Sequence, residues 1–282
     1  MTGLPTYHHL APEQFLLTDE EFSRTGRLLH ARSGIILGEH KRELAARMLG
    51  MRARKKGLRD AAEYLAHLQQ DPHSTEWNAF VNAFTINHTA FFREQHHFGL
   101  LADFMRGRTA PVSVWCCAAS TGEEAYSIAM TLLENSPGPQ ARPFVWATDI
   151  DTQAIDKARK GVYTLERVKP VAESLLKKYF YRGTGAKAGM VRVKPILQEV
   201  VQFEPLNLVA PSWPSSEKFD AIFCRNTMIY FDKPTQTRIL ERFAPMLKPG
   251  GLLFAGHSEN FTYLTKAFRL RGQTVYTLAQ GA

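Results

Sequence analysis

The chain has 282 residues, of which 44% are hydrophobic and 22% are charged, and it carries a formal net charge of +8. This composition is ordinary for a globular protein, and the length suits one large domain or two smaller ones. No apolar run approaches membrane-spanning length and residues 1–17 lack the apolar core of a signal peptide, so we expect a cytoplasmic protein with no membrane insertion.

The three cysteines lie in apolar, strand-like runs at positions 116, 117 and 224. Because adjacent residues of a strand point to opposite faces, Cys116 and Cys117 are not expected to share a metal ion. We interpret all three as buried thiols in a reducing compartment and predict no metal site.

The positive charge is concentrated between His40 and Arg59, where eight Lys or Arg residues stand against one acid, Glu43. Such a segment favours an acidic partner, which could be nucleic acid, an anionic membrane surface or an acidic protein helix. The alternative is an ordinary solvated helix face.

The first part of the chain is predicted to be a flexible tail over residues 1–17, followed by an all-helical domain over residues 18–85. Thr18 with an acid three residues on is typical of a helix start, and Gly57 is predicted to end the second helix. In that second helix Leu44, Met48 and Met51 are expected to share one apolar face. Further helices are predicted over residues 61–70 and from near residue 74, with no strand before residue 110.

Residues 86–110 are interpreted as a junction segment that is rich in both aromatic and polar side chains. Phe91 and Phe92 are expected to anchor it by packing. Asn87, Thr89 and Arg93 could then be held at a cleft, because domain junctions are common ligand sites. For Arg93, a structural salt bridge is the alternative.

Residues 111–282 show a strand–helix–strand pattern that begins with an apolar run ending in small residues at 118–122. Small residues there let a ligand approach the backbone closely. Glu123 and Glu124 at the start of the next helix would repel a pyrophosphate, and they suit a ligand with hydroxyls or positive charge, such as S-adenosylmethionine. A tight turn with acids favoured by the helix dipole is the alternative.

Polar or small residues end four of the predicted strands. Asp149 ends the second strand, where an acid is placed to bind ribose hydroxyls, and Asp151 or Thr152 can cap the helix that follows. Ligands of open α/β sheets lie beyond the carboxyl ends of the strands, so a common site is predicted. The four positions are Gly122, Asp149, Asn207 and Asn226.

Residues 162–199 interrupt this pattern with a short helix and two alternating runs joined by a glycine-rich turn, which predicts an antiparallel β-hairpin insertion. Its edge could accept a peptide as an added strand, and a merely structural flap is the alternative. The main pattern then resumes with a strand over 219–224, a helix from Asp232, a turn over 248–251 and a closing strand pair near the C-terminus.

Four motifs resemble those of the chemotaxis receptor glutamate O-methyltransferase (CheR) family of class I S-adenosylmethionine-dependent methyltransferases. The resemblance extends over nearly the whole chain from about Thr18, with the motifs in the order of the family. They are Thr89-Ala-Phe-Phe-Arg-Glu94, Ala119-Ser-Thr-Gly-Glu-Glu124, Cys224-Arg-Asn-Thr-Met-Ile-Tyr-Phe-Asp232 and Gly256-His-Ser-Glu-Asn260.

The resemblance implies an α/β fold: a Rossmann-like class I methyltransferase sheet with a small antiparallel β-subdomain insertion, preceded by an all-helical N-terminal domain. It also implies S-adenosyl-L-methionine as cofactor and S-adenosyl-L-homocysteine as product. The transfer site is implied to hold Arg93 and Tyr230. The implied cofactor-binding residues are Asn87, Thr89, Arg93, Glu123, Glu124, Asp149, Asn207, Leu208, Arg225 and Asn226.

The implied reaction is attack of a glutamate carboxylate on the sulfonium methyl group. A carboxyl group with a pKa of about 4.3 is ionised at neutral pH, so no general base is required and catalysis depends on alignment in a dry site. Arg93 is expected to orient the carboxylate without binding it too tightly.

The resemblance also gives the basic helix a partner, because family members modify glutamates on the acidic cytoplasmic helical bundles of chemoreceptors. Arg47, Arg54 and Lys55 are the residues expected to contact them. In some family members the β-subdomain captures a peptide at the receptor C-terminus, and the turn at residues 183–189 resembles that form.

Two other functions are weighed against this one. A nucleic-acid methyltransferase would suit the basic charge, but adenine and cytosine amino-methylating enzymes usually carry Asn/Asp-Pro-Pro-aromatic where this chain has Arg225-Asn-Thr-Met228, so no nucleic-acid partner is expected. A non-enzymatic signalling adaptor would not need polar residues at four strand ends.

Overall fold

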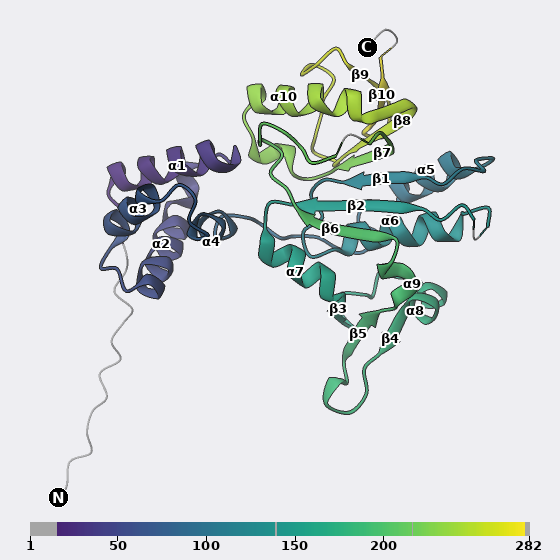
Figure 1. The fold of residues 1–282 in the computed structure, drawn as a ribbon, viewed down its shortest axis with the longest axis horizontal. Helices are drawn as coiled ribbons and strands as arrows, with labels where there is room; N and C mark the ends of the chain where they lie inside the picture. The colour runs from purple at the N-terminus through teal and green to yellow at the C-terminus, as the bar shows by residue number, and fades with distance from the viewer. Residues whose placement is uncertain (1–15, 139, 216, 280–282) are drawn as a thin grey trace, which may run out of the picture. The chain divides into compact units, whose positions relative to one another are not determined.

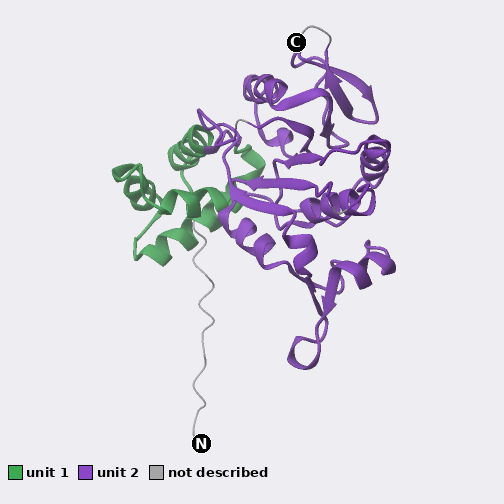
Figure 2. Cartoon of the chain, turned by 45° about the vertical axis from the view of Figure 1, so that its right-hand side comes forward, with its two compact units in different colours: residues 1–32, 37–84 green, residues 33–36, 85–282 purple. Residues whose placement is uncertain are grey.

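The computed structural model describes residues 16–138, 140–215 and 217–279, which form two compact units (Figure 2). Of the described residues, unit 1 contains 16–32 and 37–84, and unit 2 contains 33–36 and 85–279. Residues 1–15 of the predicted tail lie outside the described residues, while Leu17 is buried. That residues 33–36 belong to unit 2 was not expected from the sequence.

Unit 1 is helical throughout its described residues, as the sequence predicted. Thr18 and Glu21 form a reciprocal capping box, since the Thr18 hydroxyl accepts from the Glu21 amide at 3.2 Å and the Glu21 carboxylate accepts from the Thr18 amide at 2.8 Å. Gly57 ends the second helix with φ +69°. The helices are α1 (Asp19–Ser33), η1 (Glu39–Lys41), α2 (Arg42–Lys56), α3 (Ala61–Gln70) and α4 (Glu76–Asn82).

The predicted apolar face of α2 was wrong. Met51 is 46% exposed, and Leu44 and Met48 are only half-buried. The helix packs against α3 through a stripe of mostly small residues instead, and small side chains allow two helices to approach closely. The buried residues are Ala45, Ala46, Leu49, Gly50 and Ala53.

Unit 2 is built on a seven-stranded sheet in the order β6-β2-β1-β7-β8-β10-β9 (Figure 1). The first five strands are parallel, β10 is antiparallel to β8, and β9 is antiparallel to β10. The chain order reverses between β1 and β7, and such a switch point opens a ligand crevice at the carboxyl edge of a sheet. The strands are β1 (Ser113–Cys116), β2 (Phe144–Asp149), β6 (Val201–Pro205), β7 (Phe219–Cys224), β8 (Leu247–Ala255), β9 (Phe268–Gly272) and β10 (Val275–Leu278).

Helices cover both faces of this sheet, with a separate apolar core on each side. Cys116 lies in the core beneath α5, α6 and α7, whereas Cys117 lies in the core beneath α10, which confirms that the two thiols point to opposite faces. Both are buried and free, as is Cys224. The helices are α5 (His96–Met105), α6 (Glu123–Glu134), α7 (Thr152–Lys160) and α10 (Lys233–Phe243).

Two local predictions in unit 2 differ from the structure. Helix α5 lies in the segment expected to be a junction, because Phe98, Leu101 and Met105 at helical spacing bury against the sheet. The predicted turn over 248–251 is part of β8, where a register shift beside β7 absorbs the glycines.

The insertion after α7 is a three-stranded antiparallel sheet in the order β3-β5-β4, which we call the β-subdomain. The predicted hairpin is confirmed as β4 and β5, and β3 is an additional strand that the sequence did not indicate. Its elements are β3 (Val162–Thr164), α8 (Glu173–Tyr179), β4 (Phe180–Arg182), η2 (Gly185–Lys187), β5 (Met190–Val193) and α9 (Pro195–Gln198).

Among the described residues, no helix combines the length and the apolar character that crossing a membrane requires.

Candidate functional site

The loop after β1 requires glycine at one position. Gly122 has φ +98°, and a Cβ atom there would lie 2.8 Å from Ala158 Cβ and 2.9 Å from the Tyr163 hydroxyl. Ser120 is also left-handed, with φ +49°. This compact turn starts α6 and leaves backbone rather than bulky side chains at the carboxyl end of β1.

Asp149 is the last residue of β2 and lies beside that loop. Its carboxylate accepts hydrogen bonds from the backbone amides of Ser120 and Asp151, each at 2.8 Å. Burial raises the pKa of Asp149 to about 6, although both amide hydrogen bonds favour the ionised form. Each oxygen keeps acceptor capacity for a further donor, such as a ribose hydroxyl.

Asn87 connects the two strand ends. Its amide nitrogen donates to Asp151 Oδ2 at 2.6 Å, and its oxygen accepts from the Ser120 hydroxyl at 2.8 Å. The other oxygen of Asp151 caps α7, as the sequence predicted, through the amides of residues 153 and 154. Asn87 therefore fixes the loop after β1 against the start of α7.

A buried ion cluster lies at the carboxyl ends of β1 and β7. Arg225 is fully buried there; its Nε lies 3.3 Å from Glu124 Oε2 and its Nη2 lies 3.6 Å from Glu94 Oε2. Burial opposes the ionisation of Glu94, but Arg225 and the neighbouring donors hold the pKa of Glu94 below its ordinary value. Burial raises the pKa of Glu124, with Arg225 acting in the opposite direction.

Arg225 also donates a hydrogen bond to the carbonyl oxygen of Arg93. The Arg93 guanidinium in turn donates to the His88 carbonyl at 2.9 Å. The backbone on either side of Arg93 is strained, since Phe92 and Glu94 both have positive φ. Arg225 is thus positioned to hold the Arg93 segment rather than to reach a ligand itself.

Tyr230 lies in the one-turn helix η3 (Met228–Tyr230) that follows β7. Burial raises the pKa of its phenol, and the positive charge of Arg93 opposes that shift. The two residues predicted at the transfer site are therefore electrostatic neighbours.

Glu259 organises the same edge of the sheet, and the sequence did not single it out. Its buried carboxylate accepts hydrogen bonds at 2.6–3.0 Å from four backbone amides, which belong to residues 226, 227, 228 and 256. It thereby joins the loops after β7 and β8, and Asn226 in that turn has φ +57°. An acid in the Gly256–Asn260 motif, three residues beyond a buried strand, is the available sequence signal.

The remaining predicted cofactor residues lie around this edge. Glu123 is buried, with Oε1 3.5 Å from Arg167 Nη2 and Oε2 bonded to the Thr121 hydroxyl. The Thr89 carbonyl accepts from Arg167. Asn207 and Leu208 follow β6, beside the end of β2, and the Asn207 side chain accepts from the amide of Val209.

The residues predicted to bind a receptor lie on α2 in unit 1, separately from the edge described above. The cations of α2 divide into two sets. Arg52 and Lys56 both pair with buried Glu76, whereas the second set is exposed and forms no ion pair with any described residue. That second set is Arg47, Arg54 and Lys55.

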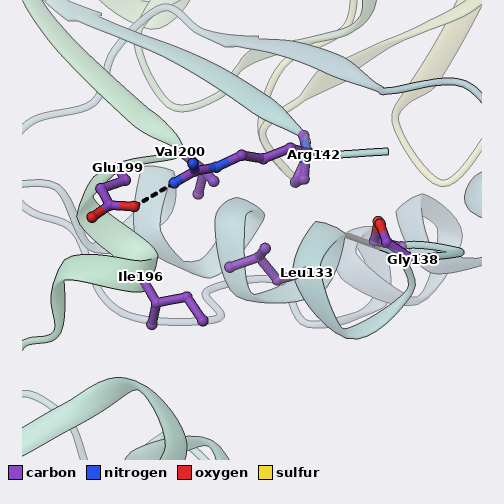
Figure 3. Close-up of a pocket in the computed structure, with 8 residues that line it drawn as sticks. Leu133, Gly138, Arg142, Ile196, Glu199 and Val200 are labelled. Carbon is purple, nitrogen blue, oxygen red and sulfur yellow. Dashed lines mark hydrogen bonds and ion pairs between the residues drawn. The ribbon is translucent and has the colours of Figure 1, made fainter. Parts of the chain in front are cut away.

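A pronounced hollow of unit 2 lies at the opposite edge of the sheet. It has a volume of about 430 Å³ and is lined by residues that precede β2 and β6, with the Arg142–Glu199 ion pair at one side (Figure 3). Because ligands of open α/β sheets bind at the carboxyl ends of strands, we do not assign the site to this hollow.

A parallel sheet with its switch point between β1 and β7, a glycine turn after β1 and an acid ending β2 define a class I methyltransferase fold. Residues 87–277 match the family model described as the CheR methyltransferase SAM-binding domain, and residues 20–85 match the CheR methyltransferase all-alpha domain.

Characterised relatives give the same result. The chain is 54% identical over 264 residues to a chemotaxis protein methyltransferase of Klebsiella aerogenes, covering 94% of this chain and 91% of the relative. It is 52% identical over 268 residues to that of Escherichia coli, covering 95% and 94%. It is 48% identical over 270 residues to chemotaxis protein methyltransferase 2 of Pseudomonas aeruginosa, covering 95% and 96%.

The chain therefore belongs to the CheR methyltransferase family. The predicted fold, enzyme class and cofactor are confirmed: it is an S-adenosylmethionine-dependent methyltransferase of chemotaxis. The residues present fit the cofactor, since a glycine turn gives access to the backbone, Asp149 can accept from ribose hydroxyls, and the buried carboxylates of Glu123 and Glu124 suit sulfonium and ammonium charge.

Proposed function

We propose that this protein transfers a methyl group to glutamate side chains on the cytoplasmic helices of chemoreceptors, giving methyl esters that serve sensory adaptation. Membership of the CheR family is the observation that carries the proposal. We place the enzyme in the cytoplasm, where those helices lie.

The bound cofactor supplies an electrophilic sulfonium methyl group. On the protein side, Asp149 binds the ribose hydroxyls, Asn207 and Leu208 lie beside the adenine, and the Glu123–Glu124 pair faces the positive charges. Thr89 and Asn226 complete the pocket. The geometry supports indirect roles for two further predicted residues, because Asn87 and Arg225 are already bonded to Asp151, Ser120 and the Arg93 carbonyl.

Arg93 and Tyr230 orient the substrate carboxylate for in-line attack. The carboxylate is already ionised at neutral pH, so the site need not hold a base, and the reaction cancels two opposite charges. A guanidinium that also donates to the His88 carbonyl has part of its capacity occupied, which limits how strongly it can stabilise the attacking anion.

The partner contacts are divided between two surfaces. The exposed cations Arg47, Arg54 and Lys55 meet the acidic face of the receptor bundle. The β-subdomain binds the receptor C-terminal peptide as an added strand on an outer strand, β3 or β4. In its tight turn a Cβ at Gly183 would lie 2.1 Å from the Lys187 carbonyl oxygen, which explains the glycine.

The test is methylation of a purified cytoplasmic chemoreceptor fragment with methyl-labelled S-adenosylmethionine, followed by treatment with base. A glutamate methyl ester releases labelled methanol, whereas methyl groups on nitrogen stay bound. Arg93→Ala and Arg93→Lys should lower turnover while the purified variants still fold. Base-stable label, label on nucleic acid, or unchanged turnover and cofactor affinity in both Arg93 variants would contradict the proposal or the Arg93 role respectively.

A further inference from the structure

Exposed apolar side chains gather on the loops around the candidate transfer residue Tyr230. Ile229, its neighbour in η3, is 53% exposed, Ile36 is 46% exposed and Tyr263 is 93% exposed. Single exposed apolar residues are common, so the position of these three is what needs an explanation. We call Ile36, Ile229 and Tyr263 the apolar strip.

Backbone contacts hold one end of the strip beside Tyr230. The Ile36 amide donates to the Tyr230 carbonyl at 2.9 Å, and Ile35 forms an antiparallel bridge with Phe231. All of these residues belong to unit 2, so Ile36 is fixed next to η3 although it is distant in sequence.

The other end of the strip borders a hollow of about 670 Å³ beside the first turn of α10. Lys233 and Pro234 line it from α10, and Tyr263 and Leu264 line it from the loop after β8. The Thr237 hydroxyl donates to the Leu264 carbonyl at 3.0 Å and ties this loop to the helix. Lys233 is exposed, so the hollow has apolar walls and one cation at its rim.

We propose that the apolar strip docks one helix of the protein substrate, with apolar residues one turn from the methylated glutamate packing on Ile229 and Tyr263. This inference rests on the proposed function. A glutamate that reaches Arg93 and Tyr230 brings the side chains three and four residues away onto the same helix face, about 5–6 Å from it. Those side chains then meet the strip, and an acidic residue of the same helix meets Lys233. The substrate helix is therefore recognised by an apolar stripe as well as by charge.

The experiment compares Ile229→Ser, Tyr263→Ser and the double variant with Ile196→Ser. Ile196 is a matched control, because it is 51% exposed but lies in the hollow at the opposite edge of the sheet (Figure 3). The KM and kcat are measured for a purified cytoplasmic chemoreceptor fragment, and the Kd for S-adenosylhomocysteine is measured by calorimetry.

We expect the double variant to raise the KM about tenfold, while kcat at saturating receptor and the Kd stay within about twofold. The increase should persist at high salt, because apolar contacts are not screened as ion pairs are. Ile196→Ser should behave as wild type. Tyr263→Ser is the safeguard against misfolding, since that side chain is almost fully exposed.

A wild type that methylates the receptor together with a double variant of unchanged KM would overturn the inference, as would an equal rise for Ile196→Ser. If the strip instead joins two copies of this chain, sedimentation would show a wild-type dimer that the double variant loses without any change in KM, and this too would overturn it. A wild type that does not methylate the receptor would contradict the proposed function itself.

Discussion

Asp149 is a carboxylate whose environment makes its charge depend on pH near neutrality. It ends β2 and accepts two backbone amides, yet burial raises its pKa to about 6. A ribose hydroxyl donates best to an ionised acceptor. Cofactor affinity should therefore depend on whether this one proton is bound.

We predict that the affinity for S-adenosylhomocysteine falls about tenfold between pH 7.5 and pH 5, because a group with a pKa of 6 is then about nine-tenths protonated. Asp149→Asn keeps the shape and removes the titration, so its binding should be weak and nearly independent of pH. Calorimetric titration across this range measures both proteins. A wild-type affinity that does not change from pH 7.5 to pH 5 would contradict the ribose role of Asp149.

At the scale of elements, α5 is held to the β9–β10 turn by a buried histidine. His97 Nε2 lies 3.0 Å from the Gln273 carbonyl oxygen and 3.1 Å from the Thr274 hydroxyl, and its ring packs on Phe254. Burial lowers the pKa of His97 to about 4, despite the Gln273 carbonyl, which favours the charged form. The folded protein therefore holds this imidazole neutral.

The sign of the pH effect follows from that depressed pKa. Below pH 6.5 the unfolded chain binds a proton that the folded chain refuses, so the stability contributed by His97 is present above pH 6.5 and is lost as pH falls toward 4. We predict a loss of about 2 kcal/mol from this group between pH 7 and pH 5. His97→Gln, which keeps a donor for the Gln273 carbonyl, should be less acid-sensitive by that amount in urea unfolding. Equal pH dependence in the two proteins would show that His97 is not the group that titrates.

At the scale of the whole molecule, the net charge of +8 is not spread evenly. Within α2, buried Glu76 neutralises Arg52 and Lys56, while Arg47, Arg54 and Lys55 remain exposed and outside any ion pair among the described residues. This division identifies which cations of a basic helix are available to an acidic partner.

We predict that Arg47→Glu, Arg54→Glu and Lys55→Glu each raise the receptor KM roughly fivefold at low salt, because each replaces an attraction by a repulsion. The effect should shrink at high salt, in contrast to that of the apolar strip. Lys218→Glu, an exposed reversal beside the amino edge of the sheet in unit 2, is the matched control. Loss of S-adenosylhomocysteine binding in the α2 variants, or an equal effect of Lys218→Glu, would refute this assignment.

The sequence by itself determined the features that depend on short-range pattern. The capping box at Thr18, the glycine turn before α6 and the acid at the end of β2 could be read directly, because each needs particular residue types a few positions apart. The motifs then identified the family, and the alternating and helical runs gave the class of fold.

Only the tertiary structure decided which side chains meet across distant parts of the chain. The apolar residues of α2 allowed more than one buried face, and packing on α3 selected the small residues while leaving Met51 exposed. Likewise, Glu259 bonding four amides, Arg225 holding the Arg93 carbonyl and Ile36 bonding Tyr230 join segments that are 31 or more residues apart or lie on different loops. Local sequence pattern carries no information about such pairs, because they form only when the sheet brings the carboxyl ends of its strands together.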